Sequence, residues 1–192
     1  ASIMDASKII AFGHYQDDYW DYVTSKKSPV GLKCLPIILI PTYPSSGSEY
    51  DSCAVATEKG NINFVFGISS EYSFLVPKYS LSLNHELTSY ANLVTLVQLC
   101  IVVLGDKNPI SYDLGISVIK NVLKATHELK NNPNDLKSRG IILYGASIST
   151  SEWIGLGKET DFASDFYCLE IILEILFNST YRKSLTALFP PY

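Results

Sequence analysis

The sequence predicts a mixed α/β region over roughly the first 80 residues, followed by a region built only from helices. An apolar, β-branched run at residues 37–40 indicates one strand, and two alternating runs within residues 53–66 indicate a hairpin. From residue 84 onward apolar residues recur at helical spacing, and prolines separate the segments. We therefore divide the chain into two predicted domains, residues 1–82 and residues 83–192.

The composition narrows the class of protein. The 192 residues are 47% hydrophobic and 18% charged, which is enough apolar material for a core. The net charge is -4 and the lysines and arginines are dispersed, so we expect no nucleic-acid partner. The longest apolar run, Leu93–Leu104, is too short to span a bilayer, and no signal peptide is recognisable. We therefore expect a cytoplasmic protein without a membrane partner. The cysteines, at positions 34, 53, 100 and 168, form no CxxC pair and are expected to be reduced.

The α/β region is expected to begin with a helix over residues 2–12, because Ser2 suits the N-cap position and Asp5 lies in the first turn. The acidic and aromatic run at residues 14–23 predicts a surface turn with Trp20 directed inward, and a sugar or cation site is the alternative. Strands are then expected at Ile37–Ile40, at residues 53–57 and 62–66 as a hairpin, and at Phe74–Val76.

The helical region is divided by capping residues and prolines. Asn84 is the expected N-cap of a helix that runs to Leu104. Pro109 begins a second helix, and Pro133 with Asp135 begins a third. The second helix is expected to bury Ile116, Ile119, Leu123 and Leu129, and a fourth, over Asp161–Phe177, to bury Phe162, Phe166, Leu169, Leu173 and Leu176.

The stretch Thr42–Asp51, TYPSSGSEYD, follows the first predicted strand and has the small hydroxyl residues and glycine of a turn. Backbone amides that are free at such a turn can hold a phosphate or a ribose. A glycine there also lets a ligand approach the main chain closely. A plain connecting loop has the same composition, so both interpretations stay open at this point.

Several segments resemble one enzyme family. The TYPSSGSE run at residues 42–49 is similar to the TTxxTGSE segment of the iron-containing (group III) alcohol dehydrogenases, and of their butanol-dehydrogenase branch in particular. Ser2, Asp5 and Lys8 resemble the end of that family's GGGSxxDxxK motif. Further similar positions are Trp20–Asp21, the hairpin glycine Gly60 and the segment from Pro77 to Thr88.

The resemblance implies an incomplete Rossmann-like nucleotide-binding half followed by a helical domain, an architecture shared with dehydroquinate synthase. The match begins inside the phosphate-binding motif and the first residue is Ala1 rather than Met, so we expect upstream strands to be missing from this chain. The family transfers hydride between an alcohol and a nicotinamide cofactor. The residues that the resemblance places at NAD(P) are Ser2, Asp5, Thr42, Ser46, Gly47 and Ser48.

The family's metal ligands are not matched. One aspartate and three histidines hold the divalent metal in the family, since several ligands must converge on it. Val94 stands at the position of the aspartate and Gln98 at that of the next histidine. Asp165 and Leu169 stand at a pair of histidine positions, and residues 175–179 contain no histidine for the last ligand. We therefore expect no metal and name no catalytic residue. The histidines present are His14, His85 and His127, which lie far apart in the chain.

Three hypotheses follow. The first is a degenerate, non-catalytic homologue that binds its own copy or a related dehydrogenase, because absent upstream strands would leave an open sheet edge near Ile37–Ile40. The second is an active NAD(P)H-dependent alcohol or aldehyde oxidoreductase that uses another proton donor. The third is a fragment or an imperfect sequence whose missing motifs are an artefact. We favour the first.

Overall fold

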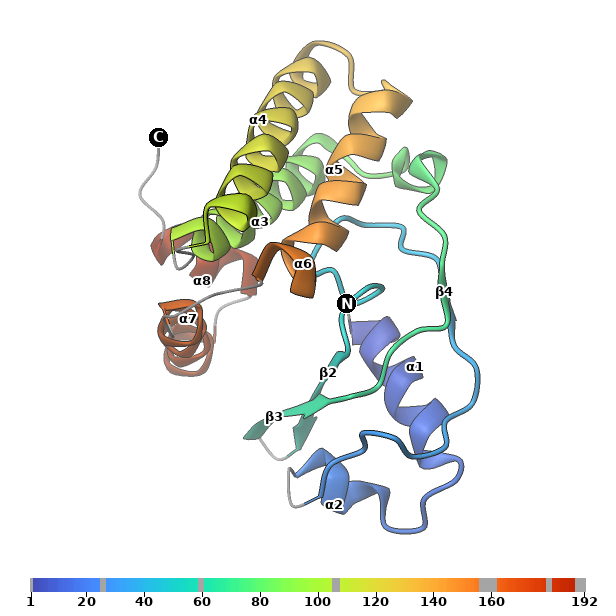
Figure 1. Cartoon of the computed structure of the whole chain (residues 1–192). Helices are drawn as coiled ribbons and strands as arrows, with labels where there is room; N and C mark the ends of the chain where they lie inside the picture. The colour runs from blue at the N-terminus through green and yellow to red at the C-terminus, as the bar shows by residue number, and fades with distance from the viewer. Residues whose placement is uncertain are drawn as a thin grey trace.

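The computed structural model describes residues 2–24, 27–58, 61–104, 108–155, 162–178 and 181–188. In these ranges an α/β arrangement precedes a group of packed helices (Figure 1). In chain order the elements are α1 (Ser2–Gly13), α2 (Tyr19–Val23), β1 (Ile38–Leu39), β2 (Cys53–Glu58), β3 (Asn61–Phe66), β4 (Tyr72–Ser73), the 3₁₀ turn η1 (Pro77–Ser80), α3 (His85–Leu104), α4 (Pro109–Asn131), α5 (Leu136–Ser149), α6 (Glu152–Gly155), α7 (Phe162–Phe177) and α8 (Tyr181–Leu188).

The strands of the described residues form two small sheets. The hairpin β2–β3 is antiparallel and pairs Cys53 with Phe66 and Glu58 with Asn61, which confirms the predicted hairpin. Its predicted glycine, Gly60, lies outside the described residues. Strands β1 and β4 pair in parallel over two residues each, Ile38 with Tyr72 and Leu39 with Ser73.

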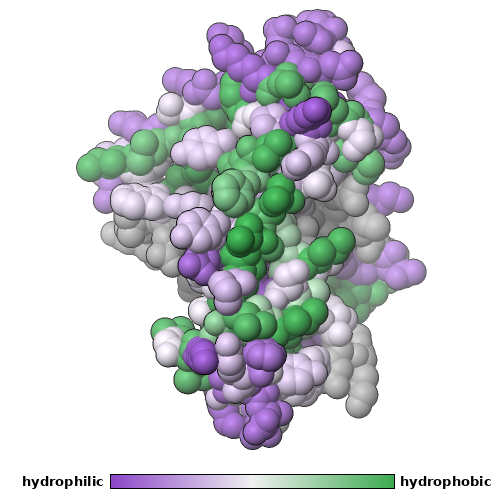
Figure 2. Space-filling model, turned by 90° about the vertical axis from the view of Figure 1, so that its right-hand side faces the viewer, coloured by the Kyte–Doolittle hydropathy of each residue, from purple (hydrophilic) through white to green (hydrophobic). Residues whose placement is uncertain are grey.

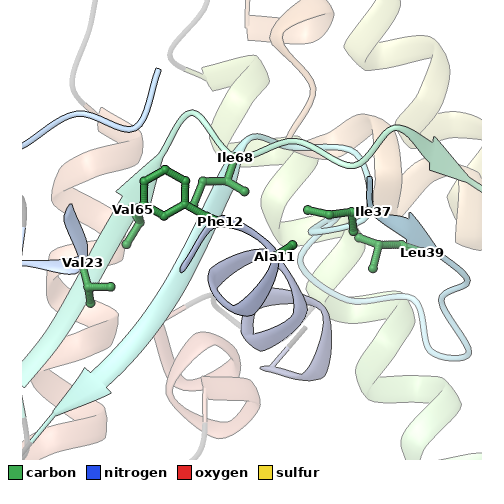
Figure 3. Close-up of a cluster of buried hydrophobic side chains, with 7 residues drawn as sticks. All are labelled: Ala11, Phe12, Val23, Ile37, Leu39, Val65 and Ile68. Atoms are coloured by element: carbon green, nitrogen blue, oxygen red, sulfur yellow. The ribbon is translucent and has the colours of Figure 1, made fainter. Parts of the chain in front are cut away.

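A hydrophobic core joins α1, α2 and both sheets. Phe12 of α1 is 2% exposed, and Figure 3 shows it in one group with Val65 of β3 and Val23 of α2. Helix α1 also packs directly against β2. Trp20 is partly buried against this core, as predicted, although it lies in the short helix α2 rather than in a turn. The complete cluster is Ala11, Phe12, Val23, Ile37, Leu39, Val65 and Ile68.

The helical region is a layer of α3, α4 and α5 that pack against one another (Figure 1). Two predicted N-caps are confirmed: Asn84 Oδ1 accepts from the Leu87 amide at 2.8 Å, and Asp135 Oδ2 accepts from the Ser138 amide at 2.9 Å. At the contact of α4 with α5, a Cβ added to Gly145 would lie 2.6 Å from Val122 Cγ2, so a glycine is needed there. The buried cluster is Leu99, Val102, Val122, Ala125, Leu129, Ile142 and Ile154.

Three predictions about the elements are wrong. The strand expected at Phe74–Val76 lies at Tyr72–Ser73, because β1 pairs there. On α4 Leu129 is buried as predicted, but Leu123 is 51% exposed, and Val122 and Ala125 belong to the buried face instead. On α7 the described side chains of Leu169 and Leu176 are exposed. The predicted helix start Asp161 and the side chains of Phe162 and Phe166 lie outside what the structure describes. The domain limits at residues 82 and 83 stay a prediction.

Helix α3 differs from the expectation that its apolar run is too short for a bilayer. It contains 20 residues and is long and apolar enough to cross a membrane by length and composition. Of its most apolar 18-residue segment, 56% is buried inside the protein, as is usual for a helix in a protein core. Length and composition are therefore weak grounds for a membrane span.

Candidate functional site

The turn after β1 packs against the end of α5. Gly47 adopts a φ of +72°, and its carbonyl accepts hydrogen bonds from the amides of Tyr50 at 2.8 Å and Asp51 at 3.1 Å. A Cβ added to Gly47 would lie 2.7 Å from the carbonyl oxygen of Ala146 and would also overlap Thr150 Oγ1. Gly47 is therefore required by the backbone conformation and by helix contact. Both reasons are independent of any ligand.

Two of the residues expected at the cofactor form a hydrogen bond with each other. Ser48 Oγ donates a hydrogen bond to Asp5 Oδ1, and the two residues are 2% and 5% exposed. The bond connects α1 to the Gly47 turn across 43 positions of sequence. Asp5 and Ser48 thus act as a structural link, because a buried carboxylate requires a donor.

Lys8 is a second link that sequence reasoning did not assign. It is completely buried, and its Nζ donates to Asp51 Oδ1 at 2.8 Å, to the Asp51 carbonyl at 3.0 Å and to the Cys53 carbonyl at 2.7 Å. Burial raises the pKa of Asp51, while the charge of Lys8 and a hydrogen bond from it act in the opposite direction. Asp5 and Lys8 are about one helical turn apart, and this spacing is the sequence signal that places both side chains on the same side of α1.

The same burial makes the thiol beside this link unreactive. The pKa of Cys53 is raised to about 12, mainly by burial and then by the negative charges of Asp51 and Asp5. Burial also raises the pKa values of Cys34 and Cys100. These three cysteines are free, as predicted.

The remaining cofactor candidates are more accessible. Ser2, in the first turn of α1, and Thr42 are exposed, and Ser46 is half-buried. The structure therefore brings Asp5 and Ser48 together at the Gly47 turn, and their polar atoms are engaged by the protein itself. Contacts from all six residues to NAD(P) stay a prediction.

Two of the positions matched to metal ligands, both on α3, are packed inside the helical region. Val94 and Gln98 on α3 are 1% and 2% exposed, and Gln98 Oε1 accepts a hydrogen bond from Ser149 Oγ of α5 at 3.0 Å. Leu169 on α7 is 52% exposed, and the side chain of Asp165 lies outside what the structure describes. Within the described ranges, no three His, Cys, Asp or Glu residues are grouped to hold a metal. A valine and an engaged amide do not fit the family's divalent metal.

The described histidines are likewise separate from these positions. His14 follows α1, His85 begins α3 and His127 lies on α4, and all three are exposed. His14 contacts the ring of Tyr15 edge-on, with ring centroids 4.7 Å apart.

A cavity lies beside the Gly47 turn. It has a volume of about 470 Å³ and is bounded by the turn, by residues that follow β4, and by α4, α5 and α6. Glu49 and Ser151 line it and are 3% and 6% exposed. Sequence reasoning included Glu49 in the TYPSSGSE run without giving it a role and did not mention Ser151, because the segments that form the cavity are distant in the chain.

Comparisons with known proteins agree with this fold. Residues 1–81 match the family model for iron-containing alcohol dehydrogenase. The chain is 24% identical over 196 residues to the probable NADH-dependent butanol dehydrogenase 1 of Bacillus subtilis, covering 98% of this chain and 50% of that protein. It is also 24% identical, over 209 residues, to the NADH-dependent butanol dehydrogenase A of Clostridium acetobutylicum, covering 98% of this chain and 49% of that protein.

Solved structures show the same fold. The crystal structure of NADH-dependent butanol dehydrogenase A from Thermotoga maritima superposes with a TM-score of 0.82 at 23% identity, over 95% of this chain and 47% of that chain. Sulfoacetaldehyde reductase from Bifidobacterium kashiwanohense, solved in complex with NAD+, superposes with a TM-score of 0.79 at 22% identity, over 96% of this chain and 49% of that chain. The chain spans about half the length of the curated relatives it matches. The chain is thus similar in sequence to the iron-containing alcohol dehydrogenases, with the family model matching residues 1–81, and it has the fold of their solved structures.

Proposed function

We propose that this chain is a degenerate homologue of the iron-containing alcohol dehydrogenases that does not perform metal-dependent dehydrogenation by itself and acts by binding another protein. The observation that carries the proposal is the environment of Val94 and Gln98. Both are buried in α3, and the Gln98 side chain accepts a hydrogen bond from Ser149. A family metal would need charged or imidazole ligands at these two positions.

The packing at these positions also has an energetic reason. An empty cage of carboxylates and imidazoles would bury polar groups without partners, at a cost of about 1–3 kcal/mol for each group. Valine has no such cost, and the Gln98 amide oxygen has a donor in Ser149. These contacts stabilise the helical region without a metal.

The proposed binding surface is the outer face of β1 and β4. Ile37 and Leu39 point into the core, whereas Ile38 and Ile40 are 60% and 48% exposed. On β4 and just after it, Tyr72 and Phe74 are 57% and 52% exposed. We call Ile38, Ile40, Tyr72 and Phe74 the outer sheet face.

Parallel sheets are usually covered on both faces, so an exposed apolar face suits a protein partner. Figure 2 views the molecule from the side on which β4 lies in Figure 1, and hydrophobic residues gather across its middle. The partner in this proposal is a second copy of the chain or a related dehydrogenase. The described β1–β4 sheet has two strands, so a strand of the partner would pair at its edge while other side chains cover the outer sheet face.

The alternative is an active NAD(P)H-dependent alcohol or aldehyde oxidoreductase. Its support is that the matched residues 1–81 include α1 and the Gly47 turn, and that the relatives are named NADH-dependent butanol dehydrogenases. In that case Ser2, Thr42 and Ser46 are the accessible candidates for cofactor contact.

One experiment separates the two functions. NADH and NADPH are titrated calorimetrically into the purified protein, its metal content is measured by mass spectrometry, and NADH oxidation with butanal is followed in the same preparation. A butanol dehydrogenase treated identically is the positive control. We expect no stoichiometric metal and no turnover. Stoichiometric iron or zinc together with NADH-dependent reduction of butanal would overturn the proposal and establish the alternative.

A further inference from the structure

The cavity beside the Gly47 turn has polar groups at its wall that the protein leaves without partners. Its volume of about 470 Å³ lies within the range of small-molecule sites, about 300 to 1,000 Å³. The α/β region contributes Glu49 and Tyr50, helices α5 and α6 contribute Ser147 and Trp153, and the link between them contributes Ser151. Figure 1 places α6 at the end of α5 nearest to the α/β region, which is where these segments meet.

Glu49 is held in place but only partly satisfied. Its backbone carbonyl accepts hydrogen bonds from the hydroxyls of Ser70, at 2.7 Å, and of Ser73. Its carboxylate Oε1 accepts from Ser147 Oγ. Among the described residues, no hydrogen bond or ion pair is made to Oε2, and this oxygen is not one of the fully enclosed unpaired atoms, so it can be reached from outside the side chain's packing. A buried carboxylate is costly unless a positive charge or several donors face it.

Ser151 adds a second unpaired group at the same cavity. Its Oγ is buried and has no hydrogen-bond partner within the part of the chain that the structure describes. Ser151 is 6% exposed and lines the cavity together with Glu49. Buried hydroxyls almost always have a partner, so an unsatisfied one at a cavity wall indicates a missing polar group.

The rest of the wall suits an organic cation that has an apolar body. Apolar side chains from α4 and α5, such as Val118 and Ile148, form much of the wall, and none of the described lining residues is a lysine or an arginine. Tyr50, Tyr144 and Trp153 line the cavity and are 51%, 59% and 67% exposed, so their rings stand near its mouth. Aromatic faces attract cations, most strongly where water is displaced.

We propose that this cavity binds a primary ammonium ion with an apolar body, an alkylamine or arylalkylamine. The ammonium group would donate to Glu49 Oε2 and neutralise its charge, and Ser151 Oγ would accept another of its protons. The apolar body would contact the side chains of α4 and α5. None of the six residues expected at NAD(P) lines this cavity, so the proposal uses none of them.

The test compares 2-phenylethylamine with 2-phenylethanol, which have similar shapes and differ in charge, by calorimetric titration near pH 7. An alkylammonium is protonated there, as lysine is with a pKa of about 10.4. We expect the amine to bind at least about tenfold more tightly than the alcohol, because its charge-assisted bond is the stronger. Equal affinities, or no binding of the amine, would overturn the proposal.

Three variants test whether the amine binds at Glu49 in this cavity. Glu49→Gln keeps the shape of the side chain and is expected to lower the affinity for the amine to that for the alcohol. Glu71→Gln, at an exposed glutamate, is the matched control and should leave both affinities unchanged. If Glu49→Gln does not fold, Leu114→Trp fills the cavity from a side chain that is 48% exposed, and it should abolish binding of the amine. Unchanged binding of the amine to the folded Glu49→Gln variant, or to Leu114→Trp, would show that the site lies elsewhere.

Discussion

The α/β and helical regions each have an apolar core, but the α/β region also has buried polar links between distant segments. In the α/β region a buried lysine with three acceptors and the Asp5–Ser48 bond hold α1 against the chain around the Gly47 turn. In the helical region apolar side chains such as Leu99 and Ile142 are buried between α3, α4 and α5. The first region has only short strands, whereas the second has helices of 20, 23 and 14 residues.

This difference determines how each region responds to change. A buried polar link fails when one partner is removed, because the other partner remains desolvated. Apolar packing loses stability in proportion to the atoms removed and the space left. The polar residues Asp5 and Ser48 belong to the first kind of contact, and Val94 belongs to the second.

The largest loss is expected from Lys8→Met. This change keeps much of the side-chain volume but removes the donor to two carbonyl groups and leaves Asp51 with the Cys53 amide in place of a cationic partner, so we expect a loss of about 4 kcal/mol in the free energy of unfolding. Urea denaturation followed by circular dichroism measures it. Lys124→Met, at an exposed position on α4, is the control and should change stability by less than about 0.5 kcal/mol. A loss below about 1 kcal/mol for Lys8→Met would mean that the polar link is not a main support of the region.

Leu99→Ala tests the apolar packing. Leu99 is fully buried in α3, so removing its side-chain atoms should cost about 3 kcal/mol of unfolding free energy. Leu123→Ala on α4 is the matched control, because Leu123 is 51% exposed, and we expect a loss below about 1 kcal/mol. Equal losses in the two variants would favour the sequence-based prediction that Leu123 faces the core.

Ser48→Ala separates the two polar links. It removes the donor to Asp5 but leaves Lys8 and its acceptors in place, so we expect a loss of about 1–2 kcal/mol in unfolding free energy, smaller than for Lys8→Met. Denaturation of the single variants and of the Ser48→Ala/Asp5→Asn double variant measures the coupling. If the double variant loses the sum of the two single losses, the hydroxyl and the carboxylate do not interact.

The smallest effect on stability is expected from Ile38→Lys on the outer sheet face. Because Ile38 is 60% exposed, the free energy of unfolding should change by less than about 0.5 kcal/mol. Sedimentation should show self-association, or association with a related dehydrogenase, in the original chain and its loss in the variant. Ile110→Lys on α4, where the isoleucine is 71% exposed, is the control. A chain that stays monomeric and does not bind such a dehydrogenase would contradict the proposed interaction.

Local signals predicted a large part of the fold. The helices that begin after Asn84 and Asp135 were predicted because a capping side chain bonds an amide three residues away. The hairpin was predicted from alternation on both sides of a short turn. The position of β4 was not, because it depends on pairing with β1 more than thirty positions earlier in the chain, where local propensity has little influence.

The sequence by itself determined the order of an α/β region followed by helices, their main caps, and the resemblance to one enzyme family. These features depend on residues that are close together in the sequence, either as neighbours or within one short motif. Only the tertiary structure decided what the polar residues do. Lys8 meets Asp51 across 43 positions, and Glu49 meets Ser147 across 98. The physical reason is that a buried charge is stabilised by whichever donors or acceptors the fold brings to it, and periodicity does not specify partners so distant in the chain.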